Sequence, residues 1–123
     1  MAVVGTLIAE SLRIGAQIEG ISFAATKIDR ARVGDTSAGQ PLVWTLMEFE
    51  IADQDAARLA SLLESALQRE GGWYCDFRTD DDTFVVFADR TFRYRRGDQA
   101  GRAAAAEHAR SVGVPEAQLD WPI

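Results

Sequence analysis

The spacing of apolar residues changes several times along this chain and limits the folds open to it. In residues 42–51 apolar side chains alternate, as in a strand, whereas the leucines of residues 59–67 recur with helical spacing. Alternation returns from Trp73 in three short segments, and residues 84–87 are apolar on both faces, as in a central strand. A second helical pattern follows. This order predicts an α+β domain with a mainly antiparallel sheet of about five to six strands and two helices packed on it.

Turn and capping residues set the expected ends of the two helices. Asp53 is expected to cap the first helix and Gly71-Gly72 to end it. Gly97-Asp98 precedes the second helix, which is expected to run to about Val112. The buried stripe of the first helix is predicted to contain Leu59, Leu62, Leu63 and Leu67.

The N-terminal third is less regular. Residues 6–13 fit either a strand or a short helix, and residues 21–33 predict a strand that becomes polar toward its end. Residues 34–41 combine glycine, proline and small polar residues, which predicts a flexible loop. The tail, residues 115–123, contains Trp121, and an aromatic residue so near the end predicts that the tail docks on the domain.

Composition narrows the classes of function. A chain of 123 residues predicts a single domain spanning residues 1–123. Its net charge of −6 argues against nucleic-acid binding, and single cysteine and histidine residues argue against a disulfide framework, a metal site or a metal cofactor. No apolar run is long enough for a membrane span, and a cytoplasmic location is expected. The excess of arginine over one lysine and the abundant alanine are typical of a high-GC bacterial genome.

A set of short motifs carries a resemblance to other proteins. They are Gly72-Trp73-Tyr74, Asp76-Phe77, Val85-Val86-Phe87, Phe92-Arg93-Tyr94, Arg96-Gly97-Asp98, Gly113-Val114-Pro115-Glu116 and Gln118-Leu119-Asp120-Trp121. With them, residues 42–121 resemble a group of small uncharacterised bacterial proteins. The resemblance implies a shared fold, and it assigns no catalytic residues and no cofactor.

Arginines near the last expected strand are the strongest candidates for a binding surface. Arg93 and Arg95 share one face of that strand, and Arg96 precedes the start of the second helix. Guanidinium groups beside free backbone N–H groups bind phosphate or carboxylate, so this group is a candidate site for an anionic small molecule or an acidic protein surface. The opposite interpretation is a surface on which the arginines pair with acidic neighbours.

Three further residues complete the candidate set. Tyr74 and Asp76 share the polar face of their strand, and this face is expected to continue into Arg93 and Arg95 if the strands are neighbours. His108 lies on the apolar face of the second helix, either as a packing residue or at the rim of a cleft. Cys75 alternates with Trp73 and Phe77, and is expected to be buried and unreactive.

No complete set of catalytic residues is recognisable. The turn at residues 80–82 has three aspartates but lacks the ligand spacing of a calcium loop, so a solvated turn is expected. The leading hypothesis is a small non-catalytic protein that acts through association, as a homodimer. The alternative is a binder of, or an enzyme acting on, an anionic small molecule held by Arg93, Arg95 and Arg96.

Overall fold

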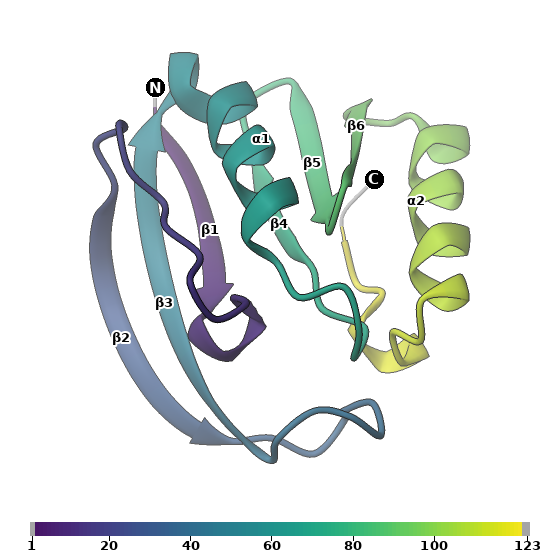
Figure 1. Cartoon of the computed structure of the whole chain (residues 1–123). Coiled ribbons are helices and arrows are strands. Elements are labelled where there is room, and N and C mark those ends of the chain that lie inside the picture. Colours follow the sequence, from purple (N-terminus) through teal and green to yellow (C-terminus); the bar gives the residue numbers. More distant parts are fainter. Residues whose placement is uncertain (1, 122–123) are drawn as a thin grey trace.

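The computed structural model describes residues 2–121, which form one sheet and two α-helices (Figure 1). The strands are β1 (Ala2–Ile8), β2 (Ala24–Arg32), β3 (Val43–Ala52), β4 (Cys75–Arg78), β5 (Asp82–Phe87) and β6 (Arg90–Arg95). The helices are α1 (Ala56–Ala66) and α2 (Gln99–Ser111). The α+β fold predicted from the spacing of apolar residues is therefore confirmed.

All pairings in the sheet are antiparallel, in the order β2-β3-β1-β4-β5-β6. The N-terminal strand β1 lies inside the sheet, paired with β3 along its length and with β4 at Val4 and Gly5. Gly5 permits the close approach there, because a Cβ would lie 2.7 Å from the Phe49 ring and 2.8 Å from the Cβ of Phe77. The strand ends at Ile8, and Ala9–Ser11 form a 3-10 turn, so residues 6–13 contain both elements.

Helix α1 covers one face of the sheet. Leu59 and Leu63 are fully buried and belong to a core that includes Phe49, Phe77 and Phe84. These aromatic rings lie close together, with Phe77 and Phe84 stacked at 5.0 Å between centroids. Burial of several large side chains on this face, each contributing about 1.5–3 kcal/mol, stabilises the fold.

Helix α2 covers the opposite face. Val85 and Phe87 form a second core with Ala105, Ala109 and Trp121. Because neighbouring residues of a strand point to opposite faces, Val85 and Phe84 mark the two sides of β5. All four residues of 84–87 are buried, which confirms that β5 is a strand covered on both sides.

The structure corrects the ends of the first helix. Asp53–Asp55 form a 3-10 turn, and α1 begins at Ala56 with Asp55 at the N-cap but without a capping side-chain hydrogen bond. The helix ends at Ala66, several residues before Gly71, because Leu67 has already turned to extended backbone and pairs with Leu12. A residue type that favours caps does not by itself fix the turn that precedes a helix.

The other expectations on the helices hold with one exception. Asp98 caps α2, accepting a hydrogen bond from the Gly101 N–H at 3.0 Å. In the first helical pattern Leu59, Leu63 and Leu67 are buried as predicted. Leu62 is only half-buried, because it lies at the border of the buried stripe and lines a surface hollow with Arg13.

Hydrogen bonds attach the loop of residues 34–41 and the C-terminal tail to the domain. The Ser37 hydroxyl donates to the Gly71 carbonyl at 2.6 Å, and Gln40 is buried beside Gly72. Arg102 donates to two tail carbonyls, those of Leu119 and Trp121, each at 2.7 Å. Trp121 is 2% exposed, so the predicted docking of the tail is confirmed.

The length and composition of the helices also bear on membranes. Within residues 2–121, neither α1 nor α2 has the length and continuous apolar character that a bilayer-crossing helix requires.

Candidate functional site

Arg93 and Arg95 project from the edge strand β6 on the side of α1. In the register of β5 and β6, Arg93 lies opposite Phe84 and Arg95 opposite Asp82. The alternating residues Phe92 and Tyr94 point to the other face, where Tyr94 is buried. The expected alternation of charged and apolar faces along this strand is therefore confirmed.

Arg93 is already engaged by the protein itself. Its Nη2 and Nε lie 2.7 and 2.8 Å from one carboxylate oxygen of Asp82, and its guanidinium stacks 4.8 Å from the centre of the Phe84 ring. Arg96 is exposed, and its backbone N–H donates to the Asp81 carbonyl at 2.8 Å. An anion at this surface therefore meets acidic side chains as well as guanidinium groups.

The polar face of β4 does not continue into these arginines, contrary to the sequence-based expectation. Asp76 pairs with Val85, which in turn pairs with Phe92, so Asp76 shares the α2 face with Phe92. Arg93 points to the opposite face. Strands β4 and β6 both pair with β5. In this register the polar side chains of β4 lie on the α2 face, whereas those of β6 lie on the α1 face.

Tyr74 and Asp76 are held in a partly buried environment. The Tyr74 hydroxyl donates to the Gln118 carbonyl at 3.0 Å, and its ring meets Trp121 edge-on at 5.5 Å. Burial raises the pKa of the Tyr74 hydroxyl, and the nearby Asp76 carboxylate raises it further. Tyr74 therefore remains a neutral hydrogen-bond donor that ties β4 to the tail.

Burial also raises the pKa of the Asp76 carboxyl; the Arg78 guanidinium lowers it and Asp120 raises it. The Arg78 Nη2 lies 3.6 Å from an Asp76 oxygen. Both residues line a hollow of about 220 Å³ with Glu48 and Thr6, and no cysteine, serine or histidine lines it. The hollow therefore brings two carboxylates and one guanidinium group together, and neither Cys75 nor His108 lines it.

His108 packs between two aromatic rings, 4.7 Å from Phe87 and 5.2 Å from Phe92. Burial lowers the pKa of its imidazole, and the positive charge of Arg90 lowers it further. Cys75 belongs to the core under α1, on the face of the sheet opposite Phe87. The thiol and the imidazole are thus on opposite sides, which rules out a cysteine–histidine pair in this structure.

The grouping of potential metal ligands can be examined for the described part of the chain. Among residues 2–121, no three histidine, cysteine, aspartate or glutamate side chains are grouped so that they could hold an ion. Asp80 and Asp81 are exposed, and Asp82 pairs with Arg93, so the acidic turn binds its neighbours and solvent.

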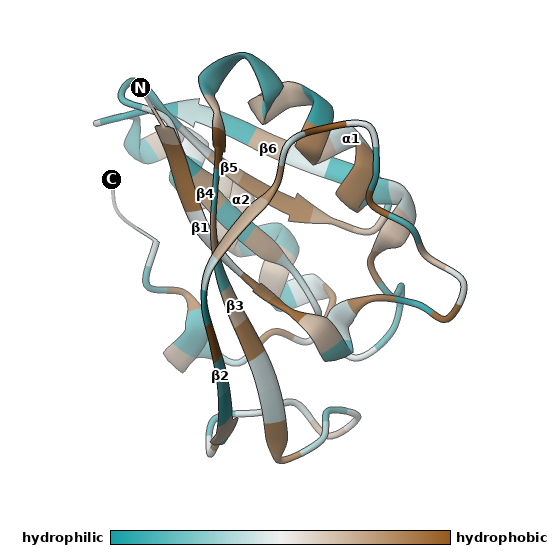
Figure 2. Cartoon of the chain, turned by 90° about the vertical axis from the view of Figure 1, so that its left-hand side faces the viewer, coloured by the Kyte–Doolittle hydropathy of each residue, from teal (hydrophilic) through white to brown (hydrophobic). Residues whose placement is uncertain are grey.

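The sequence reasoning did not single out β2 as a site. This nine-residue strand pairs with β3 on one side only and is exposed over almost its whole length (Figure 1). In Figure 2 it is largely hydrophilic and runs with β3 away from the helices. The sequence does indicate an edge strand here, because charged side chains occur on both faces of the predicted strand, a pattern typical of a sheet edge.

One hydrogen bond reveals which backbone groups of β2 face outward. The Val33 N–H donates to the Leu42 carbonyl at 2.8 Å, so the backbone N–H and C=O groups of residue 33 point toward β3. Since the backbone groups of successive residues alternate in direction along an antiparallel strand, the N–H and C=O groups of Asp29 and Ala31 also point toward β3. The N–H and C=O groups of Ile28 and Arg30 therefore face away from the sheet.

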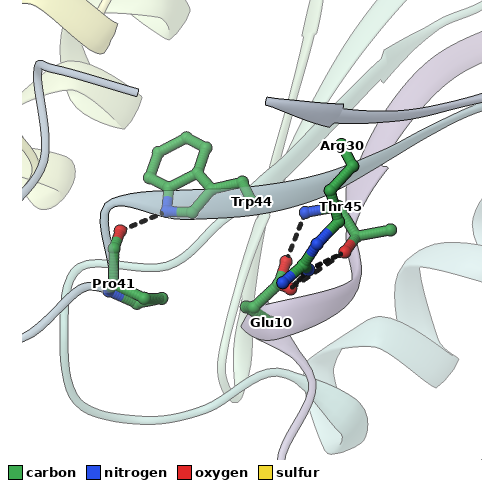
Figure 3. A network of polar contacts seen from close by, with 5 residues as sticks. All are labelled: Glu10, Arg30, Pro41, Trp44 and Thr45. Carbon is green, nitrogen blue, oxygen red and sulfur yellow. Dashed lines mark hydrogen bonds and ion pairs between the residues drawn. The ribbon is translucent and has the colours of Figure 1, made fainter. Parts of the chain in front are cut away.

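A polar network holds the β2–β3 ribbon in place (Figure 3). Glu10 accepts hydrogen bonds from the Thr45 N–H at 2.6 Å and from Arg30 Nη1 at 3.0 Å, and Arg30 also donates to the Thr45 hydroxyl. Burial raises the pKa of Glu10, but these hydrogen bonds outweigh it and leave the pKa below its usual value. The indole of Trp44 donates to the Pro41 carbonyl at 2.9 Å and fixes the far end of the ribbon.

An apolar hollow lies on the α1 face of the sheet, one strand in from the outward edge of β2. Ile28 is 66% exposed and lies opposite Met47 in the register. Met47 lines a hollow of about 430 Å³ together with Leu7, Leu12, Ile18, Ile21 and Phe23. An open apolar hollow of this kind is typical of surfaces that bind other molecules.

Comparison with known proteins adds no relative to this description. No protein-family model, curated protein or solved structure matches the chain. The resemblance to small bacterial proteins therefore stays a prediction, and the functional argument rests on the structure.

Proposed function

We propose that this protein acts through association and forms a homodimer, without a catalytic role of its own. The observation that supports the proposal is β2, a long edge strand whose backbone groups face outward beside exposed Ile28. Unpaired strand edges are templates for pairing with another chain. A stable ribbon, anchored by Glu10, presents this edge in one defined geometry.

The arrangement of the reactive side chains favours association over catalysis. Cys75 is enclosed in one core, His108 packs against the other face, and Asp76 lies in a hollow with Arg78. A catalytic site needs these groups to converge on one reacting atom. Here the sheet separates Cys75 from Asp76 and His108, and the hollow that Asp76 lines does not include His108.

Sedimentation velocity over a concentration series tests the proposal. A homodimer gives a sedimentation coefficient that rises with concentration toward the value for twice the 13.5 kDa chain. A single species at the monomer mass over the whole series, up to millimolar protein, would contradict it.

The alternative function, binding of an anionic small molecule by Arg93, Arg95 and Arg96, has weaker support. Arg93 is paired with Asp82 and stacked on Phe84, so a ligand would have to displace an existing ion pair. Inorganic phosphate provides a direct test, because a ligand that binds only the folded state raises its melting temperature. A saturable rise with phosphate that is absent with chloride at equal ionic strength, and that is lost in Arg95→Ala, would favour the alternative.

A further inference from the structure

We propose that the homodimer forms by antiparallel pairing of β2 with β2 of a second copy, about a two-fold axis at Ile28. This inference rests on the proposed homodimer and adds the surface and the register. The two sheets would join into one continuous sheet across the edge that β3 leaves open.

The direction of the backbone groups limits the register. In an antiparallel pair, residues directly opposite each other both point toward the partner strand or both point away. The outward groups of β2 belong to Ile28 and its even-numbered neighbours, so outward residues must meet outward residues of the other copy. The register shift between Ala25 and Lys27 restricts regular pairing to residues 27–32.

Charge then selects one centre within residues 27–32. A two-fold axis at Lys27, Asp29, Arg30 or Arg32 places identical charges directly opposite each other, and an axis at residue 31 places Arg30 opposite Arg32. Like charges in such positions are destabilising. Only an axis at Ile28 avoids them, and it places Lys27 of each copy opposite Asp29 of the other. Regular pairing about this axis then spans residues 27–29 of each copy.

The side chains on both faces fit this arrangement. Lys27 is 63% exposed, and its present partner Glu48 lies 3.6 Å away on the same chain, so its ammonium group is accessible to a second carboxylate. On the other face, the Ile28 side chains of the two copies would lie side by side. The apolar hollow next to Met47 would then flank the axis once in each copy.

The other edge of the sheet is less suited to self-pairing. Strand β6 carries Arg90, Arg93 and Arg95 and no acidic residue. Two copies joined along β6 would gather six arginines at one seam without a carboxylate on the paired strands. Charge complementarity therefore favours β2 over β6.

Cysteine cross-linking tests the register directly. Lys27 and Asp29 of facing copies would form a pair without mutual backbone hydrogen bonds, with Cα atoms about 4.5 Å apart, within disulfide range. Lys27→Cys and Asp29→Cys are prepared separately, mixed, and oxidised with copper–phenanthroline. The native Cys75 is buried and does not compete. In the mixed dimer the second Lys27–Asp29 pair remains intact, so mixed dimers are favoured.

The expected result is a covalent dimer in the mixture and little with either variant alone, because identical positions are offset by two residues. Arg95→Cys, on the opposite edge, is the matched control and should not cross-link in any mixture. Equal cross-linking of each variant alone would overturn the register. A wild-type chain that sediments as a dimer while the mixture stays uncross-linked would overturn the β2 surface alone; a monomeric wild type would overturn the homodimer itself.

Charge reversal gives a second test that needs no disulfide. Lys27→Asp or Asp29→Lys alone should weaken the dimer about tenfold, because two attractive pairs become repulsive. The double variant with both changes should restore it, since the pairs are merely exchanged. Glu48→Gln, which removes only the partner of Lys27 within the chain, is the control and should leave dimerisation unchanged. Failure of the double variant to recover would contradict the proposed pairs.

Discussion

Replacing Arg93 by alanine is expected to lower the free energy of unfolding by about 0.5–2 kcal/mol. The ion pair with Asp82 is half-exposed and contributes about 0–1 kcal/mol, and stacking over Phe84 adds about 0.5–1 kcal/mol. Arg95→Ala is the matched control. Arg95 belongs to the same face of β6 but has no ion pair among the described residues, so its replacement should change stability by less than about 0.5 kcal/mol.

Urea unfolding of a double-mutant cycle isolates the ion pair. Asp82→Asn is introduced into the wild type and into Arg93→Ala, and the coupling energy is expected to be above zero and at most about 1 kcal/mol. A cost of Arg93→Ala no larger than that of Arg95→Ala, together with zero coupling, would refute the reasoning. The arginine would then be free to bind an anion, and the alternative function would regain its central group.

Three further outcomes follow from the two cores. Leu63→Ala should cost about 2–5 kcal/mol in urea unfolding and Leu62→Ala clearly less, because only the first side chain is fully buried. The Cys75 thiol is buried and its pKa is raised by that burial, so the thiol should react with a thiol reagent only at the rate of unfolding. A fast stoichiometric reaction would contradict the buried position of Cys75. Burial raises the pKa of Asp76, so wild-type stability should fall relative to Asp76→Asn as the pH rises from about 4 through that raised pKa; a parallel pH dependence of the two proteins would be the contrary result.

Local patterns in the sequence predicted much of the fold. The burial of Leu59 and Leu63 follows from helical spacing, and that of residues 84–87 from a continuous apolar run. The strand order was not predictable in this way. Residues 2–8 lie inside the sheet only because β3 and β4 pair on either side of them, and such distant pairing leaves no local pattern.

The candidate site shows the same division. Alternation along β6 correctly placed Arg93 and Arg95 on one face. Alternation could not show that Arg93 forms an ion pair with Asp82. Nor could it show that the register of β4 and β5 places Asp76 on the α2 face of the sheet, opposite to Arg93. The exposed β2 edge was hidden for a related reason, since a polar strand predicts an edge but does not say which backbone groups are left unpaired.

Residue-resolved amide hydrogen exchange of β2, measured by NMR at low and high protein concentration, distinguishes a dimer paired along β2 from a monomer. In the monomer the inward amides of Asp29 and Ala31 are hydrogen-bonded to β3, whereas those of Ile28 and Arg30 face solvent and exchange fast. The β2 dimer predicts that the Ile28 amide becomes protected as the concentration rises, while the amides of β6 do not change. Fast exchange of the Ile28 amide at concentrations where sedimentation shows a dimer would contradict it.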